Sequence, residues 1–168
     1  MADTSLSQRV VAELTKAEKT LSSAESCTGG LIAKQLTDIS GASAVFHGAI
    51  VSYVNAVKHI VLGVSKEDLD RYGAVSAPVS RQMAAGVRML LHTDFAVSTT
   101  GVAGPDKDDF NNDVGTVYIS FAAAEQTFCY LCHFDGSREE IREAAAAFAQ
   151  NLVLRFLAGD DLQKDALP

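Results

Sequence analysis

Strand-like and helix-like segments take turns along the first hundred residues of this chain. Three segments rich in β-branched, aromatic or other apolar residues are expected as strands, at 19–24, at 45–54 and at the start of 94–105. Apolar residues at helical spacing predict helices around them, at 5–16, 28–38, 55–62, 65–72 and 76–91. A late pair of strands, 114–123 and 127–134, precedes a long helix at 137–158. This order predicts an α/β fold, namely a three-layer α/β/α sandwich with a mixed sheet.

Side chains that cap helices mark three of the expected starts. Ser65 and Ser137 stand directly before helical patterns, and Glu140 completes a capping box with Ser137. Ser76 opens the third helix and Pro78 lies in its first turn.

The length of 168 residues favours one domain, which we expect to span 1–158 and to end in a flexible tail at 159–168. With 48% hydrophobic residues, the chain has enough apolar side chains for a core.

Charge and cysteine content narrow the class of protein. The net charge of −7 and the pI of about 5.0 argue against nucleic-acid binding. No apolar run approaches the roughly 20 residues of a membrane span. An odd number of cysteines and the absence of an apolar leader indicate a cytoplasmic protein with reduced thiols. Cys129 and Cys132 form a CxxC, but the run FCYLCHF is typical of a strand rather than of a redox or zinc site.

The segment SAESCTGG at 23–30 is the first candidate site. Small polar or reactive side chains follow a predicted strand, and two glycines open a helix, as at ligand sites of open α/β sheets. The segment matches no phosphate-binding or nucleophile-elbow motif. Three interpretations therefore stay open: a plain turn capped by Ser26 or Thr28, a phosphate cradle, or a serine nucleophile at the end of a strand.

A serine nucleophile needs a base. The four histidines (47, 59, 92 and 133) share no spacing that suggests a role. Lys58 is the alternative, because a partly desolvated lysine loses its proton near neutral pH. The plain alternative for Lys58 is a solvated helix residue, and for the nearby Tyr53 a core or rim aromatic.

Two further elements could complete a site. The loop TTGVAGP at 99–105 brings Thr100 and glycines to the end of another strand, or else forms a simple exit turn. Arg138 and Arg142 lie four residues apart at a helix start, where paired guanidinium groups suit a phosphate. Neighbouring glutamates offer the alternative that both arginines form surface ion pairs.

Taken together, these segments resemble the C-terminal domain family of the CinA competence/damage-inducible proteins. The resemblance covers nearly the whole chain in the family's order and spacing: AESCTGGLIAKQLTDISGAS (24–43), SYVNAVK (52–58), LGV (62–64), YGAVSAPV (72–79), TTGVAGPD (99–106), VGTVYISF (114–121) and FDGSREEIR (134–142).

The resemblance implies a CinA C-terminal-domain-like α/β/α fold, a homodimer, and an activity. Stand-alone members deamidate nicotinamide mononucleotide to nicotinate mononucleotide and ammonia, as serine amidohydrolases that need no metal and no other cofactor. Carried onto this chain, Ser26 is the nucleophile, Lys58 the general base, and Tyr53 assists proton transfer or orients the pair. Arg142 is expected to hold substrate. The remaining pocket and oxyanion residues implied are Cys27, Thr28, Gly29, Gly30, Thr100, Gly101, Gly104 and Arg138.

Departures from the family pattern keep alternatives in play. The loop DKDDFNND at 106–113 lacks the family's glycines and carries Asp113 at the place of its proline, and Ser137 replaces the aspartate of a Gly-Asp-Arg segment. One alternative is a non-catalytic nucleotide- or partner-binding paralogue of the same fold, and another is an amidase or esterase for a different small substrate.

Overall fold

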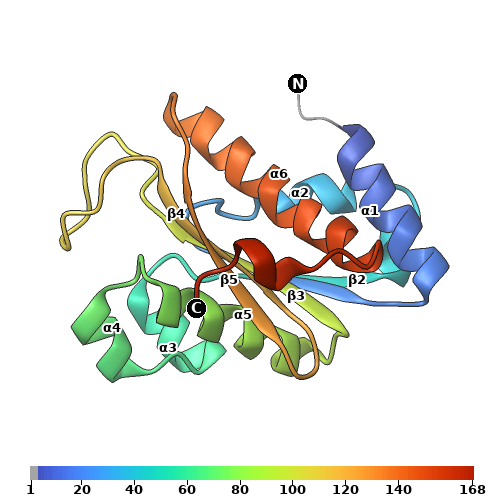
Figure 1. Ribbon diagram of the computed structural model, residues 1–168, viewed down its shortest axis with the longest axis horizontal. Coiled ribbons are helices and arrows are strands. Elements are labelled where there is room, and N and C mark those ends of the chain that lie inside the picture. Colours follow the sequence, from blue (N-terminus) through green and yellow to red (C-terminus); the bar gives the residue numbers. More distant parts are fainter. Residues whose placement is uncertain (1–3) are drawn as a thin grey trace.

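The computed structural model describes residues 4–168 (Figure 1). The α-helices are α1 Thr4–Ala17, α2 Leu31–Thr37, α3 Asn55–Leu62, α4 Lys66–Tyr72, α5 Ala77–Leu91 and α6 Arg138–Leu157. The strands are β1 Leu21–Glu25, β2 Phe46–Val51, β3 Phe95–Gly101, β4 Thr116–Ala122 and β5 Thr127–His133. Two short 3-10 helices are η1 Ala42–Ala44 and η2 Leu162–Asp165.

The five strands form one mixed sheet in the order β2-β1-β3-β4-β5. β1 lies between β2 and β3 and is parallel to both, so the carboxyl ends of these three strands meet at one edge. β4 and β5 continue the sheet in antiparallel fashion. A ligand site is therefore expected where β1, β2 and β3 end.

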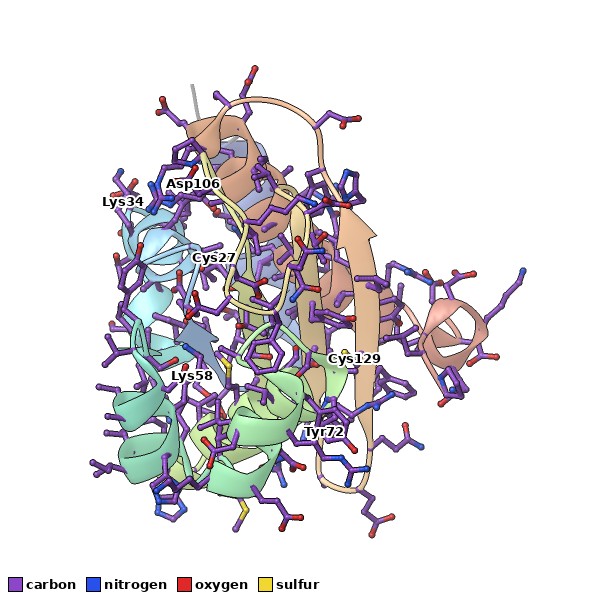
Figure 2. The ribbon with its side chains drawn as sticks, turned by 90° about the vertical axis from the view of Figure 1, so that its left-hand side faces the viewer. Cys27, Lys34, Lys58, Tyr72, Asp106 and Cys129 are labelled. Carbon is purple, nitrogen blue, oxygen red and sulfur yellow. The ribbon has the colours of Figure 1, made fainter. Side chains whose placement is uncertain are left out.

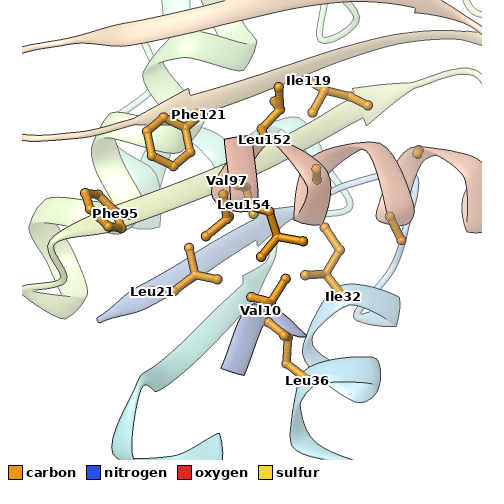
Figure 3. Close-up of a cluster of buried hydrophobic side chains, with 14 of the residues drawn as sticks. Val10, Leu21, Ile32, Leu36, Phe95, Val97, Ile119, Phe121, Leu152 and Leu154 are labelled. Atoms are coloured by element: carbon orange, nitrogen blue, oxygen red, sulfur yellow. The ribbon is translucent and has the colours of Figure 1, made fainter. Parts of the chain in front are cut away.

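Helices cover both faces of the sheet, with α1, α2 and α6 on one face and α3, α4 and α5 on the other (Figure 1). The larger core lies under the first group and includes Val10, Leu21, Ile32, Val97 and Leu152 (Figure 3). A smaller core of Ala24, Leu62, Val79, Met83 and Ala96 lies on the opposite face. The three-layer α/β/α sandwich and its mixed sheet are thus confirmed.

Local signals in the sequence located most elements to within a few residues. The Ser65 hydroxyl accepts from the backbone N–H of Asp68, and the capping box of Ser137 with Glu140 is present at the start of α6. The second strand is shorter than expected: β2 ends at Val51, because the chain turns away there to enter α3. Cys129 and Cys132 both lie in β5, as expected of strand residues.

The segment 159–168 differs from the flexible tail expected from its polar sequence. Leu162 in η2 is buried, and its carbonyl accepts from the Tyr130 hydroxyl at 2.6 Å. The Leu167 N–H donates to the Cys129 carbonyl at 2.7 Å, and the Arg81 guanidinium donates to the Leu167 carbonyl at 2.9 Å. One buried leucine and these hydrogen bonds hold the segment against β5, although most of its side chains are polar.

Within residues 4–168, no helix is both long enough and apolar enough to cross a membrane.

Candidate active site

The segment after β1 forms a tight turn into α2. Ser26 follows the last strand residue, and its backbone N–H donates to the Thr99 carbonyl of β3 at 2.9 Å. Gly29 and Gly30 have φ of 59° and 94°, a backbone region that residues with a Cβ rarely occupy. The glycines therefore let the chain reverse within a few residues, and Ser26 remains partly exposed at the end of β1.

Lys58 reaches Ser26 from α3. Its Nζ donates to Ser26 Oγ at 3.0 Å and to the Ser52 carbonyl at 2.6 Å. Figure 2 shows Lys58 beside the end of β1, with Cys27 labelled on the other side of that strand end. The parallel register of β1 and β2, which pairs Glu25 with Val51, brings the start of α3 alongside the turn at 26–30. Both members of the expected pair are thus within hydrogen-bond reach.

Burial suits Lys58 to act as a base near physiological pH. The residue is only 1% exposed, and this desolvation lowers the pKa of Lys58 from 10.5 to about 8. A lysine on the solvated face of a helix would stay protonated near neutral pH. A substantial fraction of Lys58 is neutral at pH 7 to 8 and can accept a proton.

Cys27 follows Ser26 in the same turn, and burial shifts its pKa upward, whereas it shifts the pKa of Lys58 downward. Burial raises the pKa of the Cys27 thiol from 9.0 to about 11. Because a thiol attacks as the thiolate, Cys27 is a poor nucleophile at neutral pH. The geometry therefore favours the Ser26 hydroxyl over its neighbour.

A cavity of about 210 Å³ opens over this pair. It is lined by Ser26, Cys27, Tyr53, Asn55, Lys58, Ala74, Val75, Thr100, Gly101, Ala103 and Arg138. The cationic groups in its wall are Lys58 at the floor and Arg138 at the rim. In the part of the chain that the structure describes, His, Cys, Asp and Glu form no cluster of three that could hold a metal ion.

Arg138 and Tyr53 form the rim together. Arg138 Nη2 donates to the Tyr53 hydroxyl at 2.9 Å, and Nη1 donates to the Gly104 carbonyl. Tyr53 is 59% exposed, and no hydrogen bond within residues 4–168 joins its hydroxyl to Ser26 or Lys58. A part in proton transfer therefore stays a prediction for Tyr53, whereas its contact with Arg138 is direct.

Of two further residues expected at the pocket, Thr100 lines the cavity and Arg142 does not. Thr100 lines the cavity, but its hydroxyl donates to the Ala74 carbonyl at 2.8 Å and so ties the wall together. Arg142 lies outside the cavity lining. Its guanidinium donates to two backbone carbonyls of the turn at 26–30, Cys27 at 3.1 Å and Thr28 at 2.8 Å.

Glu25 is the most important residue that the sequence analysis missed. Its fully buried carboxylate accepts hydrogen bonds from the hydroxyls of Ser23 and Thr28 and from the backbone N–H groups of Gly30, Ile32 and Ala33. These five donors shape the turn after Ser26 and begin α2. An acidic residue at the end of a fully buried strand was the available signal, because such a residue needs a dedicated set of donors.

We expect Glu25→Gln to destabilise the protein by about 3 kcal/mol. Each carboxylate oxygen accepts from at least one backbone N–H, so the amide NH₂ of glutamine must face a donor in either orientation. Urea unfolding would measure the change. Glu13→Gln on the exposed face of α1 is the matched control, with an expected change within about 0.5 kcal/mol; a Glu25→Gln loss no larger than the control would contradict this role.

The loop at 106–113, where the sequence departs from the family pattern, folds back on itself. Lys107 Nζ lies 2.6 Å from Asp113 Oδ1, and Asp108 accepts from the backbone N–H of Asn112 at 2.7 Å. The Phe110 ring covers Gly73, whose neighbours Ala74 and Val75 line the cavity. The loop thus borders the site and leaves the cavity open.

The chain is similar to proteins of one family along almost its entire length. A family model described as the CinA C-terminal domain matches residues 3–157. A CinA-like protein from Syntrophus aciditrophicus is 43% identical over 163 residues, which cover 96% of this chain and 39% of that protein. The chain spans little more than a third of the length of the CinA-type relatives it matches.

A shorter relative carries a more specific name. The nicotinamide-nucleotide amidohydrolase PncC from Enterobacter agglomerans is 48% identical over 133 residues, which cover 79% of this chain and 81% of that protein. The fold is shared with the crystal structure of the competence/damage inducible protein CihA from Agrobacterium tumefaciens, with a TM-score of 0.87 and 38% identity. That alignment covers 92% of this chain and 94% of the other.

Proposed function

Because this chain belongs to the CinA C-terminal domain family, we propose that it hydrolyses the carboxamide of nicotinamide mononucleotide to nicotinate mononucleotide and ammonia. The observation that carries the proposal is the 3.0 Å contact between Lys58 Nζ and Ser26 Oγ at the floor of a cavity. The name of the PncC relative adds the substrate class.

The reaction begins with attack on the carboxamide carbon. Neutral Lys58 accepts the Ser26 proton as Ser26 Oγ bonds to the carbon, and the carbonyl oxygen becomes an oxyanion. Lys58 then gives the proton to the leaving nitrogen, the C–N bond breaks, and ammonia departs from an acyl-enzyme. Water, deprotonated by Lys58, attacks the ester, and release of Ser26 yields the carboxylate product.

The charges around the cavity suit a pyridine mononucleotide. Its phosphate is anionic and its pyridinium ring is cationic. A single local cation can bind the phosphate, and the net negative charge of the protein does not repel the ring. Arg138 lies at the rim, where it donates to the Tyr53 hydroxyl and to the Gly104 carbonyl. A phosphate that extends out of the cavity would meet its guanidinium there.

The test is ammonia release from nicotinamide mononucleotide by purified protein, in the presence of a chelator. We expect nicotinate mononucleotide and ammonia in equal amounts. Nucleotide binding without turnover would favour the paralogue that only binds, which the altered 106–113 loop first suggested. Turnover of other amides alone would assign a different substrate.

We expect Arg138→Ala to raise KM for nicotinamide mononucleotide by about 10- to 100-fold and to change kcat little, because a charged hydrogen bond contributes about 1.5–3 kcal/mol. Nicotinamide riboside, which lacks the phosphate, is the matched comparison. Its kcat/KM should be similar in the parent and in Arg138→Ala. An equal loss with both substrates would assign Arg138 a role other than phosphate binding.

A further inference from the structure

Arg142 grips the backbone of the nucleophile turn from the side of α6. Its Nε donates to the Cys27 carbonyl at 3.1 Å, and its Nη2 donates to the Thr28 carbonyl at 2.8 Å. A Cβ added at Gly29 would lie 3.4 Å from the same guanidinium, so the turn packs directly on Arg142. Because these two hydrogen bonds direct the guanidinium at the backbone of the turn, and Arg142 does not line the cavity, it is poorly placed to bind substrate.

Because the peptide bonds of this turn are trans, the hydrogen bonds to these carbonyls also fix the directions of neighbouring backbone N–H groups. The C=O and the following N–H of one peptide plane point in opposite directions. Holding the Cys27 carbonyl toward Arg142 therefore directs the Thr28 N–H away from it. In the same way, the Ser26 carbonyl accepts from the Gly29 N–H at 3.1 Å, and this directs the Cys27 N–H.

In the described turn, the N–H groups of Cys27 and Thr28 differ from those of their immediate neighbours in the chain because they make no hydrogen bond to another backbone group. The Gly30 N–H donates to the Glu25 carboxylate and the Leu31 N–H to the Thr28 carbonyl. Within residues 4–168, the N–H groups of Cys27 and Thr28 form no hydrogen bond to another backbone group, and the contact of the Cys27 N–H is with its own thiol. They directly follow Ser26, where donors for an oxyanion are needed.

We propose that Arg142 is a positioning residue that aims the Cys27 and Thr28 N–H groups at the oxyanion, and that it does not bind substrate. Glu25 holds the opposite side of the same turn through Thr28 Oγ1 and the Gly30 N–H. The inference rests on the proposed amidohydrolase function, and it gives Arg138 and Arg142 in the first turns of α6 different roles. Arg138 faces the substrate, and Arg142 faces the catalytic backbone.

The test separates kcat from KM for nicotinamide mononucleotide in Arg142→Ala. Misaimed oxyanion donors should lower kcat by about 100- to 1,000-fold and leave KM within a few-fold of the parent. Arg142→Lys should recover part of kcat, and millimolar guanidinium chloride should restore part of kcat in Arg142→Ala. Arg155→Ala is the matched control on the same helix, because Arg155 contacts Asp160 and Asp165 and should leave both constants unchanged.

Two outcomes would overturn the proposal. A raised KM with unchanged kcat would make Arg142 a substrate ligand. An Arg142→Ala protein that is folded by circular dichroism, inactive, and unaffected by guanidinium would contradict the positioning role.

A second readout works without turnover of the nucleotide. A small alkyl fluorophosphonate reacts when Ser26 Oγ bonds to phosphorus, fluoride leaves, and Lys58 takes the serine proton; the phosphoryl oxygen needs the same N–H donors. If the parent is labelled at Ser26 but does not hydrolyse nicotinamide mononucleotide, the proposed substrate is wrong and the positioning role is still tested. Labelling should then slow by a similar factor in Arg142→Ala and not in Arg155→Ala. A parent that is neither active nor labelled overturns both proposals.

Discussion

Ser26→Ala abolishes ammonia release, with an expected loss in kcat of at least about 10⁴-fold. The Ser26 hydroxyl lines the cavity and has a base beside it, because Lys58 Nζ lies 3.0 Å from Ser26 Oγ. Binding of the nucleotide should survive, since the Arg138 rim and the oxyanion donors are unchanged. The measurement is a discontinuous ammonia assay over hours, with isothermal titration calorimetry for binding.

Cys27→Ala is the matched control for that prediction. The buried Cys27 thiol has its pKa raised to about 11, so its removal should leave most of the turnover, and its backbone N–H is retained. If Cys27→Ala lost all activity while Ser26→Ala kept it, the nucleophile would be Cys27.

Lys58→Met should lower kcat/KM by about 10³-fold or more and, at pH 7, stabilise the folded protein. The activity falls because, in the described part of the chain, Lys58 is the base that contacts Ser26 Oγ. In the parent, kcat/KM should rise about tenfold per pH unit below a pKa of about 8 and level off above it, since only neutral Lys58 accepts the proton. A profile that is flat between pH 6 and 9 would contradict Lys58 as the base.

The stability gain has a definite pH dependence. Burial lowers the pKa of Lys58 from 10.5 to about 8, so between these values the unfolded chain binds a proton that the folded protein has released. The free energy of unfolding of the parent therefore rises with pH through this window, relative to Lys58→Met. Below pH 8 the buried charge costs about 3 kcal/mol, and the loss of the hydrogen bond to the Ser52 carbonyl reduces the net gain of Lys58→Met to about 2 kcal/mol.

Urea unfolding of both proteins at several pH values would measure this difference. The two curves should cross between pH 8 and 10.5, and above the ordinary lysine pKa of 10.5 the parent should be more stable by about 1 kcal/mol, the contribution of the hydrogen bond to the Ser52 carbonyl. Because both proteins contain Cys27, titration of its thiol largely cancels in the comparison. A constant difference at all pH values would show that burial does not lower the pKa of Lys58 in the folded protein.

The layer order could be predicted from the sequence because each element carries its own periodicity and cap. The alternation of strands and helices, with Ser137 and Glu140 at the start of α6, predicts the sandwich without long-range information. The segment 159–168 was missed because Leu162 is one apolar residue among polar ones, and its burial depends on β5. Composition alone could not predict that contact.

The site was only partly accessible to sequence reasoning. The residues alone left Ser26 and Lys58 open as candidates, and the family resemblance paired them although they lie 32 positions apart in the sequence. Arg138 and Arg142, four residues apart, were expected to share a role. One helical turn is enough to give them different neighbours: Arg138 reaches the Tyr53 hydroxyl, whereas Arg142 reaches the turn after β1.

The turn that carries Ser26 is held on every side, by β3, Glu25 and Arg142, and this has a consequence for how substrate preference could change. A reaction centre with so little freedom cannot adapt its shape to a new molecule. By contrast, Tyr53, Val54 and Phe110 of the 106–113 loop are exposed. Natural variation or laboratory evolution at these outer positions could therefore redirect the same chemistry to other amides, while the residues that break the bond stay untouched.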